Sequence, residues 1–228
     1  MTRPIEDAIK AGIPIFIGYF PAAMAFGILA KGCGLALFES VLFSAVVFAG
    51  ASQFIALNLL MTGMGPGGII LTTLLVNFRH FLMSASLYNR LKQISRRYLA
   101  VIAFGVTDEV FSVLSFKKGE ISKGYVLALQ FSAYSGWVSG TVLGYITGGF
   151  LSEMVSKSMG VALYALLLAI LLPEIKRSMA SWLLAVTSGV LNAILIWMDI
   201  LPKGWSIIVC IVVIAFIGSF LIAPPMEE

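Results

Sequence analysis

The stretch LTTLLVNFRHFLMSASL, from Leu71 to Leu87, decides how this chain folds. It lies in an apolar run from Ile69 to Tyr88 that is long enough to cross a bilayer as a helix. Near the middle of this run stand Asn77, Arg79 and His80, the last of which is the only histidine in the chain. An arginine at the centre of a spanning helix costs about 2.5 to 3.5 kcal/mol even on the lenient insertion scale. We therefore expect these polar side chains to be paired, hydrated or functional.

The composition indicates an integral membrane protein. Of the 228 residues, 60% are hydrophobic and 11% are charged, and the mean hydropathy is +1.01, which leaves too little polar surface for a soluble globule. The basic residues cluster between apolar runs, as in polytopic membrane proteins, so we expect the lipid bilayer and not nucleic acid as a partner. Cys33 and Cys210 are far apart and have no metal-ligand spacing. Neither a disulfide framework, a metal site nor a cofactor is expected.

Eight hydrophobic segments predict an all-α polytopic bundle of about seven to eight transmembrane helices, forming a single transmembrane domain over residues 1–228. They are Ala11 to Ala30, Leu35 to Met61, Ile69 to Tyr88, Tyr98 to Phe116, Tyr125 to Leu151, Met159 to Pro173, Met179 to Ile200 and Trp205 to Ala223. The first contains Pro14 and Pro21, which favour a kinked or broken helix, although proline is also common in membrane helices. The fifth carries glycines at a spacing of four, from Gly136 to Gly148, which indicates a helix-packing face.

The basic residues do not decide the orientation in the membrane. If all eight segments cross, seven lysine or arginine residues fall on each side. The positive-inside rule then has no preference, unless one segment fails to cross.

A weak internal repeat is visible when the chain is aligned with itself. Gly18 falls on Gly105 at an offset of 87 residues, and on this alignment Pro21 lies opposite Asp108. The two predicted copies are residues 11–88 and 98–173, and additional C-terminal helices lie in 179–223. Because each copy has three helices, the copies would cross in opposite directions. Such an inverted repeat places a substrate site near the membrane midplane.

Two carboxylates of the fourth segment match the depth of Arg79. With a helix rise of about 1.5 Å per residue, Arg79 and Asp108 lie at similar distances from the joint between their segments. An ion pair of Arg79 with Asp108 or Glu109 would offset the cost of burial. Asn77 and His80 share one helix face. His80, Asp108 or Glu109 could carry a coupling proton, and the alternative is an ion pair and a histidine that serve packing alone.

These residues favour a transporter over an enzyme. The chain has one histidine and neither an HExxH nor a GxSxG motif, and a triad of a serine with His80 and Asp108 is a remote alternative. We expect no enzymatic activity. A channel for another small solute, or a structural membrane subunit without its own transport activity, are the remaining alternatives.

Three motifs carry a family resemblance: VFAGASQF at Val47 to Phe54, NFRH at Asn77 to His80 with LYNRL after it, and GVTDEVF at Gly105 to Phe111. With these motifs in order, the chain resembles the AzlC family of branched-chain amino acid permeases over essentially its whole length. The resemblance implies a secondary transporter of the bacterial cytoplasmic membrane that exports valine, leucine, isoleucine and, in some members, methionine, powered by the proton gradient. It also implies a second subunit, a small AzlD-type membrane protein.

An amino acid substrate needs partners for its carboxylate and its ammonium group, and an apolar pocket for its side chain. We predict that the free backbone amides of a broken first helix, with Asn77 and Gln53, bind the carboxylate. Asp108 or Glu109 is predicted to take the ammonium group or the proton. The predicted substrate-binding residues are Pro21, Gly50, Gln53, Asn77 and His80. The predicted proton-coupling or ion-pair residues are Arg79, His80, Asp108 and Glu109.

Overall fold

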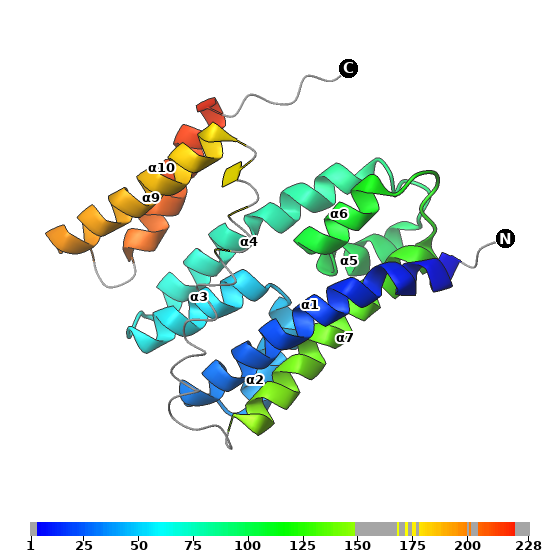
Figure 1. The fold of residues 1–228 in the computed structure, drawn as a ribbon, viewed down its shortest axis with the longest axis horizontal. Coiled ribbons are helices and arrows are strands. Elements are labelled where there is room, and N and C mark those ends of the chain that lie inside the picture. Colours follow the sequence, from blue (N-terminus) through cyan, green and yellow to red (C-terminus); the bar gives the residue numbers. More distant parts are fainter. Residues whose placement is uncertain are drawn as a thin grey trace. The chain divides into compact units, whose positions relative to one another are not determined.

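The computed structural model describes residues 4–148, 178–199 and 205–221, together with Leu168, Leu172, Ile175, Lys176 and Leu201. The described residues are predominantly helical and contain no strand, which confirms the expected all-α class (Figure 1). The helices are α1 (Pro4–Gly32), α2 (Leu37–Val47), α3 (Gly50–Met61), α4 (Pro66–Tyr88), α5 (Arg96–Phe104), α6 (Asp108–Phe116), α7 (Lys123–Thr147), α9 (Met179–Met198) and α10 (Trp205–Leu221). Most of the sixth predicted segment, Met159 to Pro173, lies outside the described residues.

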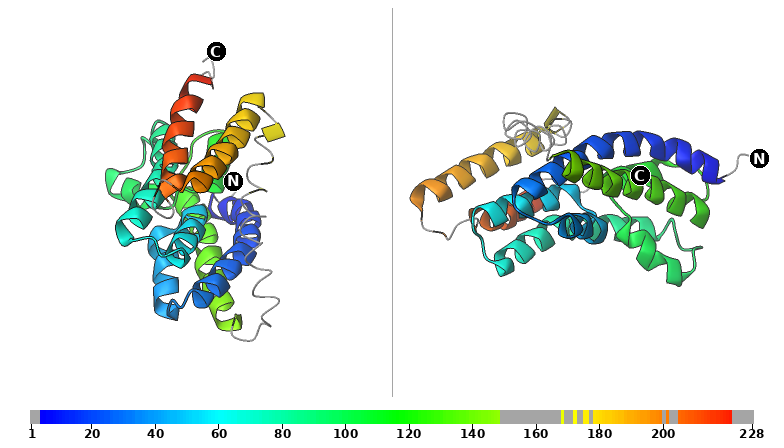
Figure 2. Two further views of the ribbon diagram at one scale, coloured as in Figure 1. Left: turned by 90° about the vertical axis from the view of Figure 1, so that its left-hand side faces the viewer. Right: turned by 90° about the horizontal axis from the view of Figure 1, so that it is seen from below.

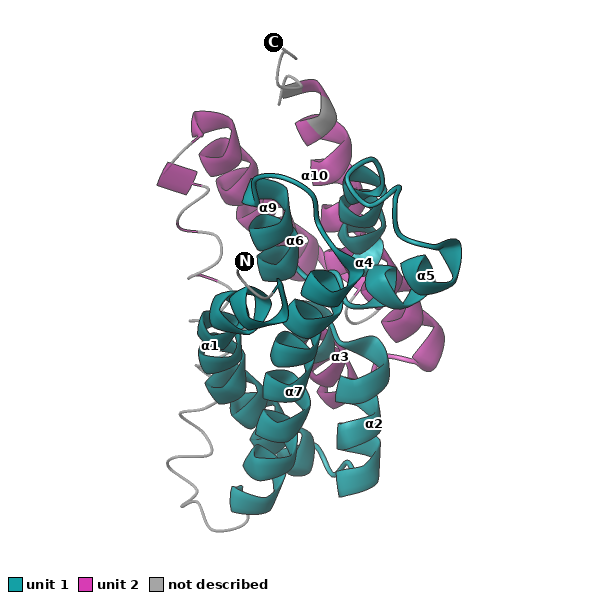
Figure 3. Ribbon diagram, turned by 90° about the vertical axis from the view of Figure 1, so that its right-hand side faces the viewer, with its two compact units in different colours: residues 1–54, 77–162 teal, residues 55–76, 163–228 magenta. Residues whose placement is uncertain are grey.

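The chain divides into two compact units, which are coloured separately in Figure 3. Unit 1 comprises residues 1–54 and 77–162, and unit 2 comprises residues 55–76 and 163–228. All residues predicted for the functional site belong to unit 1.

The centre of unit 1 is a pair of parallel helices, α1 and α7, which lie side by side in Figures 1 and 2. A Cβ atom added to Gly140 would lie 2.5 Å from the carbonyl oxygen of Phe20, and one added to Gly144 would lie 2.1 Å from that of Met24. At both positions the neighbouring backbone leaves room only for the hydrogen atom of glycine. Because the contact residues advance together along both helices, α1 and α7 run in the same direction. The glycine row is thus a packing face, as predicted, and α1 is its partner.

The first helix is not broken, contrary to the expectation. Helix α1 continues through Pro14 and Pro21. Each proline removes one helix hydrogen bond, but the close packing against α7 along most of the helix supports α1 on both sides of these positions. The breaks lie instead in the second and fourth predicted segments.

The fourth predicted segment folds back on itself and does not form one spanning helix. If Tyr98 and Phe116 were joined by a straight helix, they would be about 27 Å apart. Instead the start of α5 and the end of α6 lie together. The guanidinium group of Arg90, before α5, donates hydrogen bonds of 2.6 Å to the carbonyl oxygens of Leu114 and Ser115 in α6. Helices α5 and α6 therefore form a hairpin whose two ends lie at the same end of unit 1.

The second predicted segment also breaks, between α2 and α3. Phe48 occupies the left-handed region with φ of 44° at this point. Phe43 before the break and Phe54 after it both pack edge-on against Phe26, with ring centroids 5.7 and 5.8 Å away. Because one ring contacts both sides of the break, α2 and α3 do not continue as one straight helix.

The two interrupted segments enter unit 1 from opposite ends. Helix α2 follows the C-terminal end of α1, whereas the α5–α6 hairpin precedes the N-terminal end of α7. Since α1 and α7 are parallel, these ends are opposite. The breaks of these segments, at Phe48 and at Phe104 to Thr107, are called the hairpin tips and meet between the two ends. The rings of Phe48 and Phe104 have centroids 6.1 Å apart there, and Tyr134 of α7 packs against both.

Unit 2 contains α9, α10, the end of α3 and the start of α4. Its core is formed by Leu59, Met64 and Ile208. Over the whole described chain, α1, α4 and α9 are each both long and apolar enough to cross a membrane. The predicted three-helix repeat stays a prediction, because much of its second copy lies outside the described residues.

Candidate substrate site

The expected ion pair is present where the hairpin tips meet. A guanidinium nitrogen of Arg79, in α4, lies 2.8 Å from a carboxylate oxygen of Asp108, the first residue of α6. The two side chains are 37% and 42% exposed, so the pair lines a surface and is not sealed in the core. Asp108 also lies at the positive end of the α6 dipole. The Arg79 guanidinium and the start of α6 thus both stabilise the negative charge of Asp108.

The same turn of α4 carries unsatisfied polar atoms. Within the described part of the chain, Asn77 Oδ1, Arg79 Nε and His80 Nε2 are buried without a hydrogen-bond partner. The imidazole of His80 also faces the backbone of Val106, in the break between α5 and α6. Buried polar atoms without partners are rare because they lose their hydration without compensation. The three atoms provide an acceptor, a donor and a group that can do either, so a polar ligand or water fits there.

Tyr19 of α1 contacts both hairpin tips. Its hydroxyl donates a hydrogen bond to the carboxylate of Glu109 in α6. Its ring packs edge-on against Phe48 at 6.5 Å and against Trp137 of α7 at 5.6 Å. Sequence analysis missed Tyr19, although a lone tyrosine hydroxyl inside the first apolar segment indicates a buried hydrogen-bond acceptor nearby.

Gln53 satisfies the polar groups of the first break. Its side-chain oxygen accepts hydrogen bonds from the indole of Trp137 at 2.9 Å and from the Ala49 amide at 3.3 Å, and its amide donates to Ser44 at 3.0 Å. The Tyr134 hydroxyl donates to the Ala45 carbonyl at 3.0 Å. Ala45 and Ala49 would bond to each other in an unbroken helix. Gln53 is fully buried and therefore closes the break.

Helix α7 also satisfies the second break, which lies between α5 and α6. The amide of Gln130, in α7, donates to the Ile102 carbonyl at 2.7 Å, and a Cβ on Gly105 would lie 2.6 Å from this side chain. Thr107 caps α6 by accepting a hydrogen bond from the Val110 amide at 3.4 Å. Helix α7 thus stabilises both hairpin tips. Composition and residue spacing along the chain did not indicate this role.

The remaining predicted residues differ in position. Gly50 begins α3, and a Cβ there would lie 2.7 Å from the Trp137 ring, so glycine lets this ring close on the break. Pro21 is exposed on α1, and none of the described contacts of the hairpin tips includes it. The structure therefore brings together Asn77, Arg79, His80, Asp108 and Glu109, joined by Tyr19.

Two interrupted apolar segments whose breaks meet around charged residues are typical of membrane transport proteins, because irregular backbone within a membrane is stable only where protein or a polar cavity satisfies it. Residues 14–151, which run from within α1 to beyond the end of α7, match the AzlC protein family. The chain belongs to this family, and it is a multi-pass membrane protein.

Several relatives agree with this assignment. The chain is 33% identical to the inner membrane protein YgaZ of Escherichia coli (strain K12), over 97% of this chain and 93% of that protein. It is 36% identical to an uncharacterized membrane protein of Archaeoglobus fulgidus, over 72% of each. It is 28% identical to the branched-chain amino acid transport protein AzlC of Bacillus subtilis (strain 168), over 64% of this chain and 58% of that protein. No solved structure matches the chain.

Proposed function

We propose that this chain is the transport subunit of a proton-coupled exporter of branched-chain amino acids. The observation that carries the proposal is the group of unsatisfied atoms on Asn77, Arg79 and His80 beside the carboxylate of Asp108. An amino acid zwitterion offers both donors and acceptors, so it complements this mixed set. The printed name of the Bacillus subtilis relative supports the substrate class.

The two helix N-termini suggest how the zwitterion lies. Helix α6 begins with Asp108 and Glu109, whereas α3 begins with Gly50 and has no acidic residue in its first turn. The free amides at the start of α3 are therefore the more favourable place for the substrate carboxylate. Asn77 Oδ1 and the carboxylate of Asp108 then receive the ammonium group.

An apolar cavity next to this group suits a branched side chain. Its volume is about 110 Å³, and it is lined by Ser84, Leu87, Tyr88, Leu91, Leu99, Ile102, Ala103 and Val106. The cavity reaches Val106, whose backbone faces His80. A cavity of about 150 Å³ holds the six carbons of benzene, so this one suits about four, as in leucine or isoleucine.

Glu109 is the residue we assign to proton coupling. Asp108 is held in an ion pair with Arg79, but Glu109 accepts a hydrogen bond from the neutral hydroxyl of Tyr19. Glu109 can therefore gain a proton without breaking an ion pair. This difference favours Glu109 over Asp108 as the proton-coupling residue.

The α5–α6 hairpin also suggests the orientation. Because the fourth segment folds back, the basic residues of both flanking loops lie at one end of unit 1: Arg90, Lys92, Arg96, Arg97, Lys117, Lys118 and Lys123. Among the described residues near the opposite end, Lys31 is the basic one. The positive-inside rule then places the basic end, and the start of α1, in the cytoplasm.

The test is efflux of valine, leucine, isoleucine and methionine from dipeptide-loaded cells that produce this chain, with and without a small AzlD-type subunit. We expect partner-dependent efflux of at least one of these, lost when the proton gradient is dissipated. Verified membrane insertion of both proteins without efflux of any would contradict the proposal. Efflux that persists without a proton gradient would contradict the coupling alone.

A further inference from the structure

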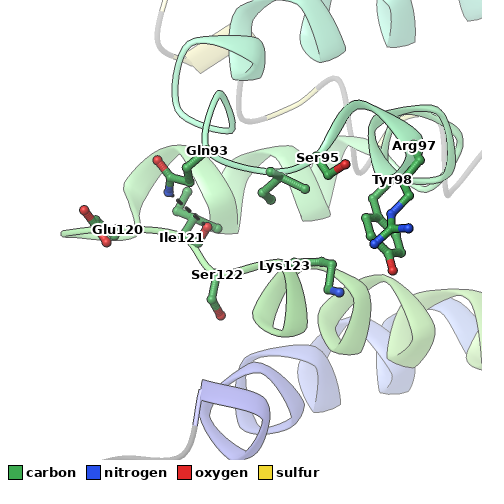
Figure 4. A pocket seen from close by; sticks show the side chains of 9 residues that line it. Gln93, Ser95, Arg97, Tyr98, Glu120, Ile121, Ser122 and Lys123 are labelled. Carbon is green, nitrogen blue, oxygen red and sulfur yellow. Dashed lines mark hydrogen bonds between the residues drawn. The ribbon is translucent and has the colours of Figure 1, made fainter.

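A second cavity lies at the basic end of unit 1, away from the hairpin tips. Its volume is about 570 Å³, and it lies between the loop before α5 and the start of α7 (Figure 4). It is lined by Gln93, Ile94, Ser95, Arg97, Tyr98, Glu120, Ile121, Ser122 and Lys123. The amide of Gln93 donates to the Ile121 carbonyl at 3.3 Å and joins the two walls. Seven of its nine lining residues have polar or charged side chains.

Two cations converge on one ring in this cavity. The Arg97 guanidinium lies 5.0 Å from the centroid of the Tyr98 ring, and the Lys123 ammonium lies 4.1 Å from it. No ion pair in the described part of the chain includes either cation. Figure 4 shows Glu120 at the far end of the cavity from Arg97 and Tyr98. Because like charges repel, an anion between the two cations would stabilise this arrangement.

The cavity lies where the start of α7 would meet the lipid headgroups if α7 crosses the bilayer. It is at the ends of membrane helices, among the basic loops that flank the α5–α6 hairpin. Its floor includes the buried Ile94 and Ile121, and Tyr98 provides the kind of aromatic ring that favours the membrane interface. Basic pockets between helix ends on the cytoplasmic side suit anionic headgroups.

We propose that this cavity binds the phosphodiester headgroup of an anionic membrane lipid. Arg97 supplies a planar set of donors that matches phosphate oxygens, and Lys123 adds a point charge. Ser95 and Ser122 provide further hydroxyl donors. Because the lining comes from both sides of the α5–α6 hairpin, the bound lipid holds the base of the hairpin against α7. The proposal does not depend on the transported substrate.

The test measures the thermal unfolding midpoint of the purified full-length chain in detergent with added phosphatidylglycerol, phosphatidylcholine or inorganic phosphate. We expect phosphatidylglycerol to raise the midpoint by about 5 °C, as saturating binding to the folded state does, and the two other additions to have little effect. The double variant R97Q/K123Q should lose this shift. The double variant K92Q/K118Q removes the same charge outside the cavity and should keep it.

An equal shift in R97Q/K123Q would overturn the proposal, and so would a shift of the same size with phosphatidylcholine. A shift with inorganic phosphate alone that requires Arg97 and Lys123 would assign the site to a free phosphate and overturn the lipid assignment. If R97Q/K123Q does not fold, the variant E120Q tests the proposal instead. Removing this carboxylate should increase the phosphatidylglycerol shift, a gain that misfolding cannot produce, and an unchanged shift would contradict the proposal.

Discussion

Tyr19 in α1 donates a hydrogen bond to Glu109 at the start of α6, across a separation of 90 residues in the sequence. Because α1 is packed tightly against α7, Tyr19 is a donor on a rigid support. Glu109 belongs instead to a hairpin of two short helices, which makes fewer contacts with α7. The hydrogen bond therefore joins a rigid helix pair to the element that carries the proposed proton site.

We predict that Glu109→Gln separates exchange from accumulation. Glutamine keeps an oxygen that can accept the hydrogen bond of Tyr19 but cannot exchange a proton. In proteoliposomes, exchange of labelled leucine should persist, whereas transport driven by a pH gradient should fall by at least about tenfold, since coupling requires a group that titrates. Glu6→Gln, in an exposed pair with Lys10, is the matched control. Gradient-driven transport at the normal rate in Glu109→Gln would remove this residue from the coupling mechanism.

Removal of one partner of the Arg79 and Asp108 pair should be worse than removal of both. Arg79→Gln or Asp108→Asn alone leaves a charge without its partner in the bundle. The cost should be below the roughly 3 to 5 kcal/mol of a fully buried pair, because both side chains are partly exposed. We expect the double variant to recover the yield of folded protein, measured by fluorescence-detected size exclusion, but not transport. Recovery of transport as well would show that the pair serves only the fold.

Gly144→Ala should destabilise the protein through the contact between α1 and α7. The added methyl group would lie 2.1 Å from the carbonyl oxygen of Met24, and such overpacking typically costs roughly 1 to 3 kcal/mol. We expect a lower thermal midpoint and a lower yield in the membrane. Gly189→Ala, in α9, meets no atom within 4 Å and should be neutral or slightly stabilising. Equal behaviour of the two variants would argue against the close parallel packing.

Ala103→Leu should change which amino acids are transported. The larger side chain fills part of the 110 Å³ cavity, so leucine and isoleucine should lose more transport than valine or alanine. One lost methylene contact is worth about 10- to 200-fold in selectivity at most. Ala100→Leu, exposed on α5 and outside the cavity, is the control. If Ala103→Leu lowers transport of all substrates equally, the cavity is not the side-chain site.

Cys33 provides a test of the orientation. It follows the C-terminal end of α1, opposite the basic loops, and we expect an impermeant maleimide to label it from outside spheroplasts. Partial burial raises the pKa of the Cys33 thiol. Because the thiolate is the reactive form, the labelling rate should continue to rise at pH values where an ordinary exposed thiol has reached its maximum. The variant Cys33→Ser should not be labelled, and labelling only after permeabilisation would reverse the orientation.

Much of the site could be predicted because charge inside an apolar segment is costly. Arg79 was expected to pair with Asp108 or Glu109 for that reason, and it pairs with Asp108. Gln53 was expected to contact substrate, but the structure shows it bonded to Trp137 and Ser44. Its partners come from another helix and from the other side of a break. The sequence pattern around Gln53 contains no information about partners that are distant along the chain.

The breaks themselves show the limit of hydropathy. An apolar stretch of about 20 residues fits one spanning helix as well as two half-helices joined by a turn. Prolines suggested a break in the first segment, yet α1 is continuous. The actual breaks occur at Phe48 and near Gly105, where α7 supplies Tyr134 and Gln130 to satisfy the freed carbonyl groups. Proline content therefore did not locate them.

The sequence by itself determined the membrane location, the all-helical class, the glycine packing face and the group of charged residues, because each follows from the cost of polar atoms in lipid or from spacing along one helix. Only the tertiary contacts show that the second and fourth segments are interrupted and that Tyr19 contacts both breaks. They also show that the basic residues on both sides of the α5–α6 hairpin lie at one end of unit 1. The physical reason is that a broken helix is stable only when other helices satisfy its backbone groups. Those partners are distant in the chain and become neighbours only on folding.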